Sequence, residues 1–237
     1  DLELPECVIL PGGTHTNHIG IRNTVMDKDN MGDPWIYIGA AWYQRDIEIP
    51  QEWSGKQITL YMERTSRTMV WLDGIPMGNC DKVQMPQYYD LTAAATPGKH
   101  NLTIRVNNKA VRPLQYATRT LNGIMGDIHL TASDAVCIKK VKVTPHVDNN
   151  RATIEIWLKN RTGVPVSGQL NLSVAETGGK HQLRDKRMQF LIEGEEKRFW
   201  LDLWMGEGVL LWDEFHPHLY KLTVDMEAGG DLGEFGA

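Results

Sequence analysis

Cysteine, long apolar runs and clustered positive charge are all scarce in this sequence of 237 residues. The three cysteines, Cys7, Cys80 and Cys137, are an odd number without a close pairing motif, so no disulfide framework is predicted. No apolar run approaches the roughly 20 residues that a membrane helix needs. The formal net charge is −5, and no basic cluster is present. We therefore expect neither a nucleic-acid nor a membrane partner.

Motifs for nucleophilic, phosphate or metal chemistry are also missing. The sequence has no Gly-x-Ser-x-Gly elbow and no Gly-Lys-Ser/Thr phosphate loop. His15 and His18 have a spacing that suits zinc on a helix, but their Gly-rich and Asn-rich surroundings predict a loop without further ligands. Residues 27–33 resemble a calcium loop, yet Met31 and Ile38 stand where an EF-hand has oxygen ligands. We expect no cofactor and no metal. Residues 27–33 are therefore interpreted as a solvated turn, and a structural calcium bound by this loop is the alternative.

Apolar and polar residues alternate along much of the chain, whereas no long segment has the 3.6-residue period of a helix. Residues 57–62 and 102–107 show this alternation most clearly, as expected for strands with one buried face. Asp73-Gly74 separates two apolar runs and predicts a β-hairpin. The first region of the chain is therefore predicted to be a β-sandwich with long loops.

A second series of short strands follows a break near residues 131–134. Its alternating segments recur at regular spacing over about a hundred residues, which is typical of an immunoglobulin-like β-sandwich. The Cys…Trp…Cys pattern of antibody domains is absent, so the prediction concerns architecture only. We therefore expect two domains, residues 1–133 and 134–237.

Several sequence blocks in a fixed order resemble a known family. The blocks are GAAWYQRDIEIP (residues 39–50), VWLDG (70–74), YDLT (89–92), PGKHNLTIRVN (97–107), GIMGDIHL (123–130) and LWDEFHPHLY (211–220). Together they resemble family 2 glycoside hydrolases, the group of β-galactosidases, β-glucuronidases and β-mannosidases. The resemblance implies an all-β chain, with a jelly-roll-like, sugar-binding-type β-sandwich over residues 1–133 and an immunoglobulin-like β-sandwich over residues 134–237.

The same resemblance implies that the catalytic centre is missing from this chain. Glycoside hydrolysis needs two placed carboxyl groups. In the family these are glutamates of a later (β/α)₈ barrel, one of them in an Asn-Glu dipeptide that this sequence lacks. Glu195, Glu196 and Glu207 are interpreted as solvated turn charges. The chain begins without Met, which we interpret as a trimmed or engineered start, and it ends at Phe235-Gly236-Ala237, where the family continues into the barrel.

We therefore expect the non-catalytic N-terminal part of a family 2 β-glycosidase of carbohydrate degradation, inactive by itself. Its expected partners are the downstream catalytic barrel and, through the intact enzyme, a β-glycoside. A self-standing carbohydrate-binding, lectin-like module is the alternative, and a purely structural β-sandwich pair is a third. The compartment is not determined by the sequence, although a periplasmic or extracellular bacterial enzyme fits the resemblance.

The segment from Asn107 to Asn122 is the candidate for lining the substrate pocket, because in the family the matching loop can reach the mouth of the barrel. It contains no Asp or Glu, unlike the matching loop of some β-galactosidases. Its polar side chains suit hydroxyl groups, and an ordinary surface loop is the alternative. The candidate substrate-binding residues are Asn108, Arg112, Gln115, Tyr116 and Arg119.

Tryptophan is frequent, with eight residues, and each is a candidate either for core packing or for stacking on a sugar ring. In the block Trp42-Tyr43-Gln44-Arg45, strand alternation places Trp42 and Gln44 on one face and Tyr43 and Arg45 on the other. We interpret the aromatic residues here, and Trp71, as packing residues of the sheet core or of a domain interface, with Arg45 paired to a carboxylate.

Overall fold

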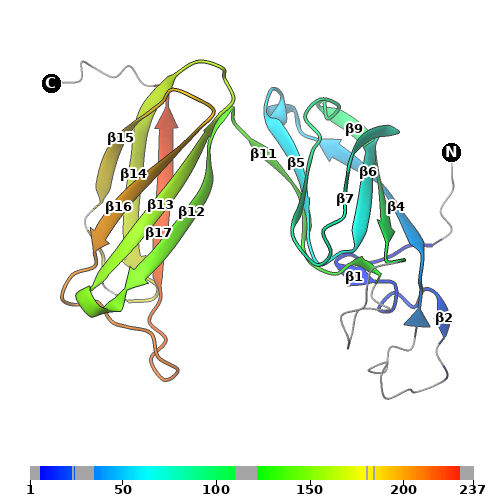
Figure 1. Ribbon diagram of the computed structural model, residues 1–237, viewed down its shortest axis with the longest axis horizontal. Coiled ribbons are helices and arrows are strands. Elements are labelled where there is room, and N and C mark those ends of the chain that lie inside the picture. Colours follow the sequence, from blue (N-terminus) through cyan, green and yellow to red (C-terminus); the bar gives the residue numbers. More distant parts are fainter. Residues whose placement is uncertain are drawn as a thin grey trace. The chain divides into compact units, whose positions relative to one another are not determined.

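The computed structural model describes residues 6–22, 24, 35–109, 122–179, 181–183 and 185–229 (Figure 1). It divides the chain into two compact units, Asp1–Ser133 and Asp134–Ala237. Within the described residues the regular structure is strand, apart from the single 3₁₀ turns η1 (Gln51–Trp53) and η2 (Val147–Asn149). The prediction of an all-β chain is confirmed.

Two antiparallel sheets form the body of the N-terminal unit, with strand orders β4-β9-β6-β7 and β11-β5-β8. Two short strand pairs, β1 with β10 and β2 with β3, belong to the same unit. The strands are β1 (Gly12–Gly13), β2 (Ile21–Arg22), β3 (Trp35–Ile36), β4 (Ala40–Ile49), β5 (Gln57–Met62), β6 (Arg67–Leu72), β7 (Ile75–Cys80), β8 (Gln87–Asp90), β9 (Gly98–Asn107), β10 (Gly123–Ile124) and β11 (Ile128–Ser133).

The core of the N-terminal unit lies between its two larger sheets. Every second residue of β5 and of β9 is buried there, because successive side chains of a strand point to opposite faces of the sheet. This confirms the predicted alternation of both strands. The core residues contributed by β4, β5, β6, β8 and β9 are Ile49, Ile58, Leu60, Met62, Val70, Leu72, Tyr89, Leu102, Ile104 and Val106.

The predicted hairpin between the two apolar runs is also confirmed. Strands β6 and β7 pair antiparallel on either side of Asp73 and Gly74, whose φ angles are 51° and 79°. Two consecutive positive φ angles are the signature of a type I′ turn, whose twist matches that of the flanking strands. Asp and Gly are residues that tolerate this conformation, and the Asp73 side chain remains free to bond elsewhere.

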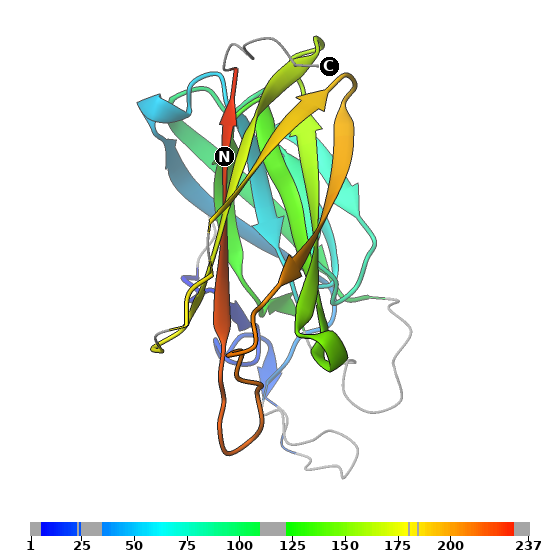
Figure 2. The same ribbon diagram turned by 90° about the vertical axis from the view of Figure 1, so that its left-hand side faces the viewer.

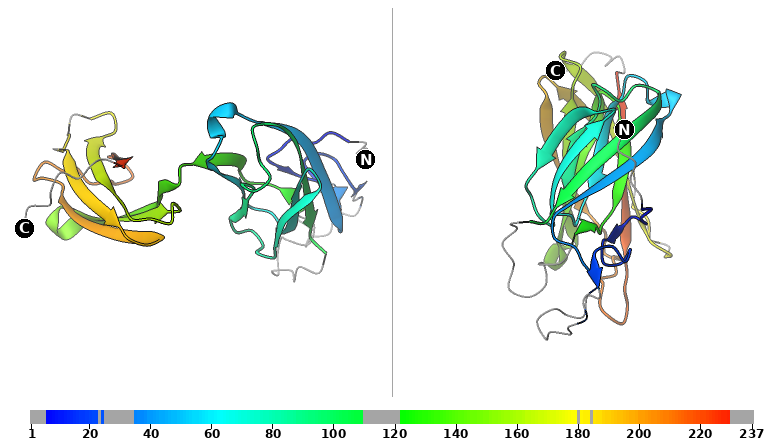
Figure 3. Two further views of the ribbon diagram at one scale, coloured as in Figure 1. Left: turned by 90° about the horizontal axis from the view of Figure 1, so that it is seen from above. Right: turned by 90° about the vertical axis from the view of Figure 1, so that its right-hand side faces the viewer.

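The C-terminal unit consists of two three-stranded antiparallel sheets, β12-β13-β16 and β15-β14-β17, seen in further orientations in Figures 2 and 3. Alternate residues from both sheets form its core, which includes Ile156, Leu170 and Phe190. The strands are β12 (Val136–His146), β13 (Arg151–Asn160), β14 (Val166–Glu176), β15 (Lys186–Ile192), β16 (Glu196–Trp204) and β17 (Tyr220–Ala228).

A buried histidine ties the β6–β7 turn to β9. The Nδ1 atom of His100 lies 2.6 Å from Oδ2 of Asp73, and its Nε2 atom lies 2.6 Å from the carbonyl oxygen of Thr96. The backbone N–H of Asn101 donates to Oδ1 of Asp73 at 2.7 Å. A carbonyl and an ionised carboxylate can only accept, so both contacts are hydrogen bonds only when both ring nitrogens carry a proton, and the arrangement favours the charged imidazole.

The pKa directions agree with this arrangement. Burial opposes the charged form of His100, but the hydrogen bonds to Asp73 and to the Thr96 carbonyl outweigh it and raise its pKa above the ordinary value. The backbone N–H of Asn101, followed by His100, lowers the pKa of Asp73. A raised histidine pKa contributes stability that is complete below the unfolded-state pKa and is lost as the pH rises through the folded-state pKa.

We expect Asp73→Asn to lower the free energy of unfolding of the N-terminal unit by about 1 kcal/mol at pH 6. Asparagine retains the type I′ turn, so the change isolates the charged hydrogen bond. The difference from wild type is expected to be largest between about pH 5 and 6.5 and to narrow at higher pH, as wild-type His100 loses its proton. Urea unfolding across this pH range measures it. The exposed Asp81→Asn serves as control, and a pH-independent difference would contradict the assignment.

Candidate functional site

The segment predicted to bind substrate begins where β9 ends. Of its five candidate residues the structure describes Asn108, while Arg112, Gln115, Tyr116 and Arg119 lie outside the described residues. Asn108 is only 6% exposed. Its Oδ1 atom accepts from the backbone N–H of Gly39 at 2.9 Å, and its Nδ2 atom donates to the carbonyl of Tyr37 at 3.1 Å. Asn108 therefore fixes the approach of the chain to β4.

Asn122, at the far end of the same segment, is fully buried beside Asn108. Its Nδ2 atom donates to the carbonyl of Gly39 at 3.0 Å and to Oδ1 of Asn108 at 3.3 Å. The backbone carbonyl of Asn122 accepts a hydrogen bond from the backbone N–H of Thr14 at 2.7 Å. The two asparagines thus hold both ends of the candidate segment against the same backbone at Gly39. We call this pair the asparagine clasp.

Unsatisfied polar atoms collect at the asparagine clasp. Within the described part of the chain, Oγ1 of Thr14, Nδ1 of His15 and Oδ1 of Asn122 are buried and lack hydrogen-bond partners. Buried polar groups in proteins are almost always paired, so three on adjoining residues mark a place suited to a polar ligand or a polar partner segment. The prediction from the sequence did not include Thr14, and it included Asn122 only as the end of the candidate segment. Gly123, the next residue, leaves room for this contact, because an added Cβ there would lie 2.7 Å from the carbonyl of Gly12.

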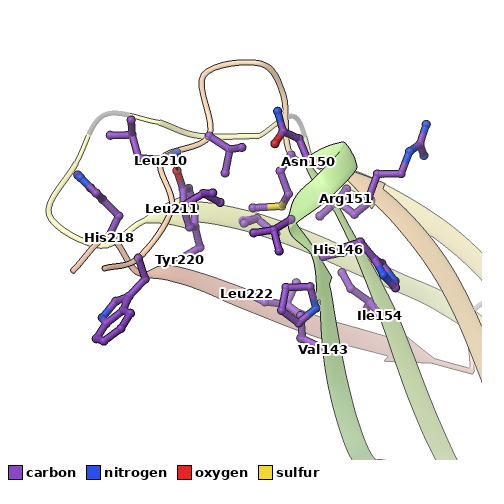
Figure 4. Close-up of a pocket in the computed structure, with 18 residues that line it drawn as sticks. Val143, His146, Asn150, Arg151, Ile154, Leu210, Leu211, His218, Tyr220 and Leu222 are labelled. Atoms are coloured by element: carbon purple, nitrogen blue, oxygen red, sulfur yellow. Dashed lines mark hydrogen bonds between the residues drawn. The ribbon is translucent and has the colours of Figure 1, made fainter. Parts of the chain in front are cut away.

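The C-terminal unit contains an apolar cavity of about 450 Å³ (Figure 4). Val143, Ile154 and Leu222 line it from the sheets, and Leu210 and Leu211 line it from the segment that precedes β17. The polar groups at its edge belong to His146, Asn150, Arg151, His218 and Tyr220. An apolar cavity of this size suits an apolar side chain or ring, and nothing in its lining resembles a pair of catalytic carboxyl groups.

Next to the cavity, residues 210–219 form an ordered turn that exposes apolar side chains, which we call the apolar hairpin. The Oδ1 atom of Asp213 accepts from the backbone N–H groups of Phe215 at 2.8 Å and of His216 at 2.6 Å. These two bonds, that of His216 first, lower the pKa of Asp213. Phe215 is 81% exposed as a result. The apolar residues that are largely exposed here are Leu210, Leu211, Trp212, Phe215 and Leu219.

Other sequence candidates are located as follows. Within the described residues no group of three or more His, Cys, Asp or Glu side chains is arranged to hold a metal ion. No helix in the described part of the chain is long and apolar enough to cross a membrane.

The two neighbouring glutamates lie on the surface beside lysines. Nζ of Lys159 lies 3.5 Å from Oε2 of Glu195, and Nζ of Lys139 lies 2.8 Å from Oε2 of Glu196.

Within the Trp42 block, Tyr43 packs in the sheet core as predicted, whereas Trp42 does not, so only the domain-interface alternative remains for Trp42. Tyr43 packs against the core, and burial, with a smaller effect of Tyr37, raises its pKa to about 12. Trp42 points to the outer face of the sheet and is 47% exposed. There it stacks on Trp71, with ring centroids 5.4 Å apart. Trp71 is therefore a neighbour of Trp42 and not a core residue.

Comparison with known proteins assigns both units. The family model "Glycosyl hydrolases family 2" matches residues 136–234, and the model "Alpha-mannosidase, jelly roll domain" matches residues 16–115. The jelly-roll and immunoglobulin-like architectures predicted from the sequence are thereby confirmed.

Curated relatives include a protein named "Beta-glucuronidase" from Paenibacillus borealis, 32% identical over 224 residues, and a "Putative beta-glucuronidase" from Formosa agariphila, 24% identical over 214 residues. Each alignment covers 84% of this chain, which spans 35% and 24% of the respective relatives. Among solved structures, a glycosyl hydrolase family 2 member from Bacteroides cellulosilyticus covers 93% of this chain with a TM-score of 0.72 and 17% identity, and this chain covers 30% of it. At that identity the likeness shows the fold.

We expect Asn108→Ala to lower the free energy of unfolding of the N-terminal unit by about 2 kcal/mol, because the amide N–H of Gly39 and the carbonyl of Tyr37 would remain buried without partners. Urea unfolding followed by tryptophan fluorescence measures the change. Asn79→Ala, at an exposed position of β7, is expected to stay within about 0.5 kcal/mol of wild type. If the two substitutions change the free energy of unfolding equally, the asparagine clasp does not stabilise the N-terminal unit.

Proposed function

This chain carries the immunoglobulin-like domain of glycosyl hydrolase family 2 together with a jelly-roll domain, and from this premise we propose that it is the non-catalytic N-terminal part of a β-glycosidase of the β-glucuronidase type. In this role the two sandwiches support a catalytic barrel. They also contribute the segment between Asn107 and Asn122 to its substrate pocket.

One observation carries the proposal. The alignment with the Paenibacillus borealis relative covers 84% of this chain but only 35% of that protein, so most of the relative lies outside the two sandwich domains. Hydrolysis of a glycosidic bond requires two carboxyl groups on either side of it. Glu195 and Glu196, interpreted from the sequence as solvated charges, lie beside lysines on the surface. The chemistry is therefore assigned to the part of the protein that this chain does not include.

The apolar hairpin supports a role in packing against another domain. Exposed apolar side chains that gather in one place mark interaction surfaces far more often than scattered ones do. The hydrogen bonds of Asp213 order the turn in advance, which lowers the entropy cost of docking. The neighbouring cavity of about 450 Å³ has room for a side chain of the partner domain.

The asparagine clasp supports a role in the substrate pocket. It fixes both ends of the candidate segment and so limits where that segment can contact a neighbouring domain. The side chains proposed to make this contact are those of Arg112, Gln115, Tyr116 and Arg119. Asn108 itself is occupied by backbone groups. We therefore propose that Asn108 positions the segment and that the other four residues contact the sugar.

The first test is activity of this chain alone. We expect no hydrolysis of chromogenic β-glucuronides, β-galactosides, β-mannosides or β-glucosides between about pH 4 and 8, because the carboxylate pair is missing. The longer protein that contains both sandwiches and the barrel serves as the positive control. Turnover that survives stringent purification and disappears on a point substitution within residues 1–237 would overturn the non-catalytic assignment.

The second test concerns the candidate segment in the longer protein. Arg119→Ala is expected to lower kcat/KM by roughly three- to tenfold, because one hydrogen bond to a sugar hydroxyl is worth about 0.5–1.5 kcal/mol. Steady-state kinetics on the best β-glycoside measure it, with Arg187→Ala on the exposed side of β15 as the matched control. If Arg119→Ala and Tyr116→Ala both leave kcat/KM unchanged, the segment is scaffold.

A further inference from the structure

The outer face of the sheet β4-β9-β6-β7 presents two tryptophans to solvent. Trp42 stands opposite Arg105 in the pairing of β4 with β9, and Trp71 stands opposite Thr103 in the pairing of β6 with β9. Their rings meet across β9 and stack, with an interplanar angle of 28°. We call this pair the tryptophan platform. Although Trp42 is stacked, nearly half of its surface remains open.

Hydrogen-bonding side chains lie beside the tryptophan platform in a fixed row. Nε2 of Gln44 donates to Oδ1 of Asn101 at 2.7 Å, and Nδ2 of Asn101 donates to Oδ1 of Asp46 at 2.9 Å. The hydroxyl of Thr103 donates to the same Asn101 oxygen at 3.2 Å. These bonds hold the side chains in place and leave further donors and acceptors of Gln44 and Asp46 free for a ligand. An aromatic surface flanked by ordered amides suits a sugar, which offers both C–H faces and hydroxyls.

A positive charge without a carboxylate partner completes this face. The guanidinium of Arg105 lies 5.9 Å from the centre of the Trp42 ring, and its Nη1 atom contacts the sulfur of Met69 at 3.5 Å. No ion pair links Arg105 to a carboxylate among the described residues. An unpaired guanidinium beside a stacking surface favours a ligand that carries a carboxylate, which it can bind through two parallel hydrogen bonds.

The C-terminal unit offers an instructive contrast. Trp200 is 62% exposed and also has a guanidinium above it, that of Arg198, at 4.9 Å. Arg198, however, forms an ion pair with the buried carboxylate of Glu155, which Lys142 also contacts at 3.2 Å. The guanidinium over Trp200 is therefore already bound to a carboxylate of the protein. Aromatic rings with cations above them are common to both units, and the stacked pair of indole rings beside a row of ordered amides distinguishes the tryptophan platform.

We propose that the tryptophan platform binds a glycan chain that contains uronate residues. Trp42 and Trp71 stack on the sugar rings, Arg105 binds a uronate carboxylate, and Gln44 and Asp46 bind hydroxyls. A protein partner fits this face less well, because a stable interface buries about 800 Å² per partner around an apolar centre. Here the neighbours of the two rings are mainly polar.

Affinity gel electrophoresis of this chain tests the proposal, with polygalacturonate in the gel as acidic probe and a neutral galactan as comparison. Wild type is expected to be retarded by polygalacturonate and at least several-fold less by galactan. Trp42→Ala and Trp71→Ala are each expected to weaken retardation tenfold or more, and Arg105→Met to remove the preference for the acidic glycan. Raising the salt concentration from low to about 0.5 M is expected to weaken binding of polygalacturonate.

Trp200→Ala is the matched control, since it removes an even more exposed tryptophan beside an arginine, and it is expected to bind as wild type does. Circular dichroism checks that each variant is folded. The proposal is overturned if wild type is not retarded, if galactan retards it as strongly as polygalacturonate, or if Trp42→Ala binds unchanged. None of these outcomes bears on the non-catalytic assignment, because that assignment is tested by hydrolysis of small chromogenic substrates by this chain alone, which does not depend on the platform.

Discussion

The pleat of the β-strand, which sends successive side chains to opposite faces, is the constraint on which the rest of this molecule depends. In β5 and β9 it commits every second residue to the core, and the core is what holds each pair of sheets together. The side chains on the opposite face of each strand do not contribute to the core and can contact solvent or a ligand. On β4, β6 and β9 that outward half carries Trp42, Trp71 and Arg105, so the same strands build the fold and present a surface.

A second constraint acts where strands end and the backbone loses its ladder partners. Buried N–H and C=O groups still require hydrogen bonds, and side-chain amides supply them at the asparagine clasp. The His100 and Asp73 pair does the same for the β6–β7 turn by means of charge. Polar side chains thus satisfy backbone groups at the borders of the sheets, while the sheet interiors combine apolar packing with buried, hydrogen-bonded polar side chains such as Thr68 and Gln87. The three unsatisfied atoms at Thr14, His15 and Asn122 are the exception, and they adjoin the segment to which we assign function.

Local pattern was sufficient to predict the all-β class, the alternation of β5 and β9 and the hairpin at Asp73-Gly74, because each depends on residues close in sequence. The core alternative for Trp42 was wrong. Alternation separates two faces but does not tell which face is inward, and that depends on pairing with β9, far along the chain. Thr14 and Asn122 could not be linked for the same reason, since their contact joins residues more than a hundred positions apart. Of the predicted site residues, only Asn108 lies in the described part of the chain, where it holds backbone and is not open to a ligand.

The asparagine clasp has a consequence for how such a protein can diversify. Because Asn108 and Asn122 fix the two points at which the intervening segment leaves and rejoins the sandwich, the framework does not depend on what lies between them. Lengthening a loop whose ends are already held costs only a slowly growing amount of entropy, about 0.6 kcal/mol for each doubling of length. Insertions and substitutions in this stretch therefore cost little stability, whereas a substitution of either asparagine destabilises the fold. If the segment contacts the sugar as we propose, related proteins can change their sugar preference within it and keep the same scaffold.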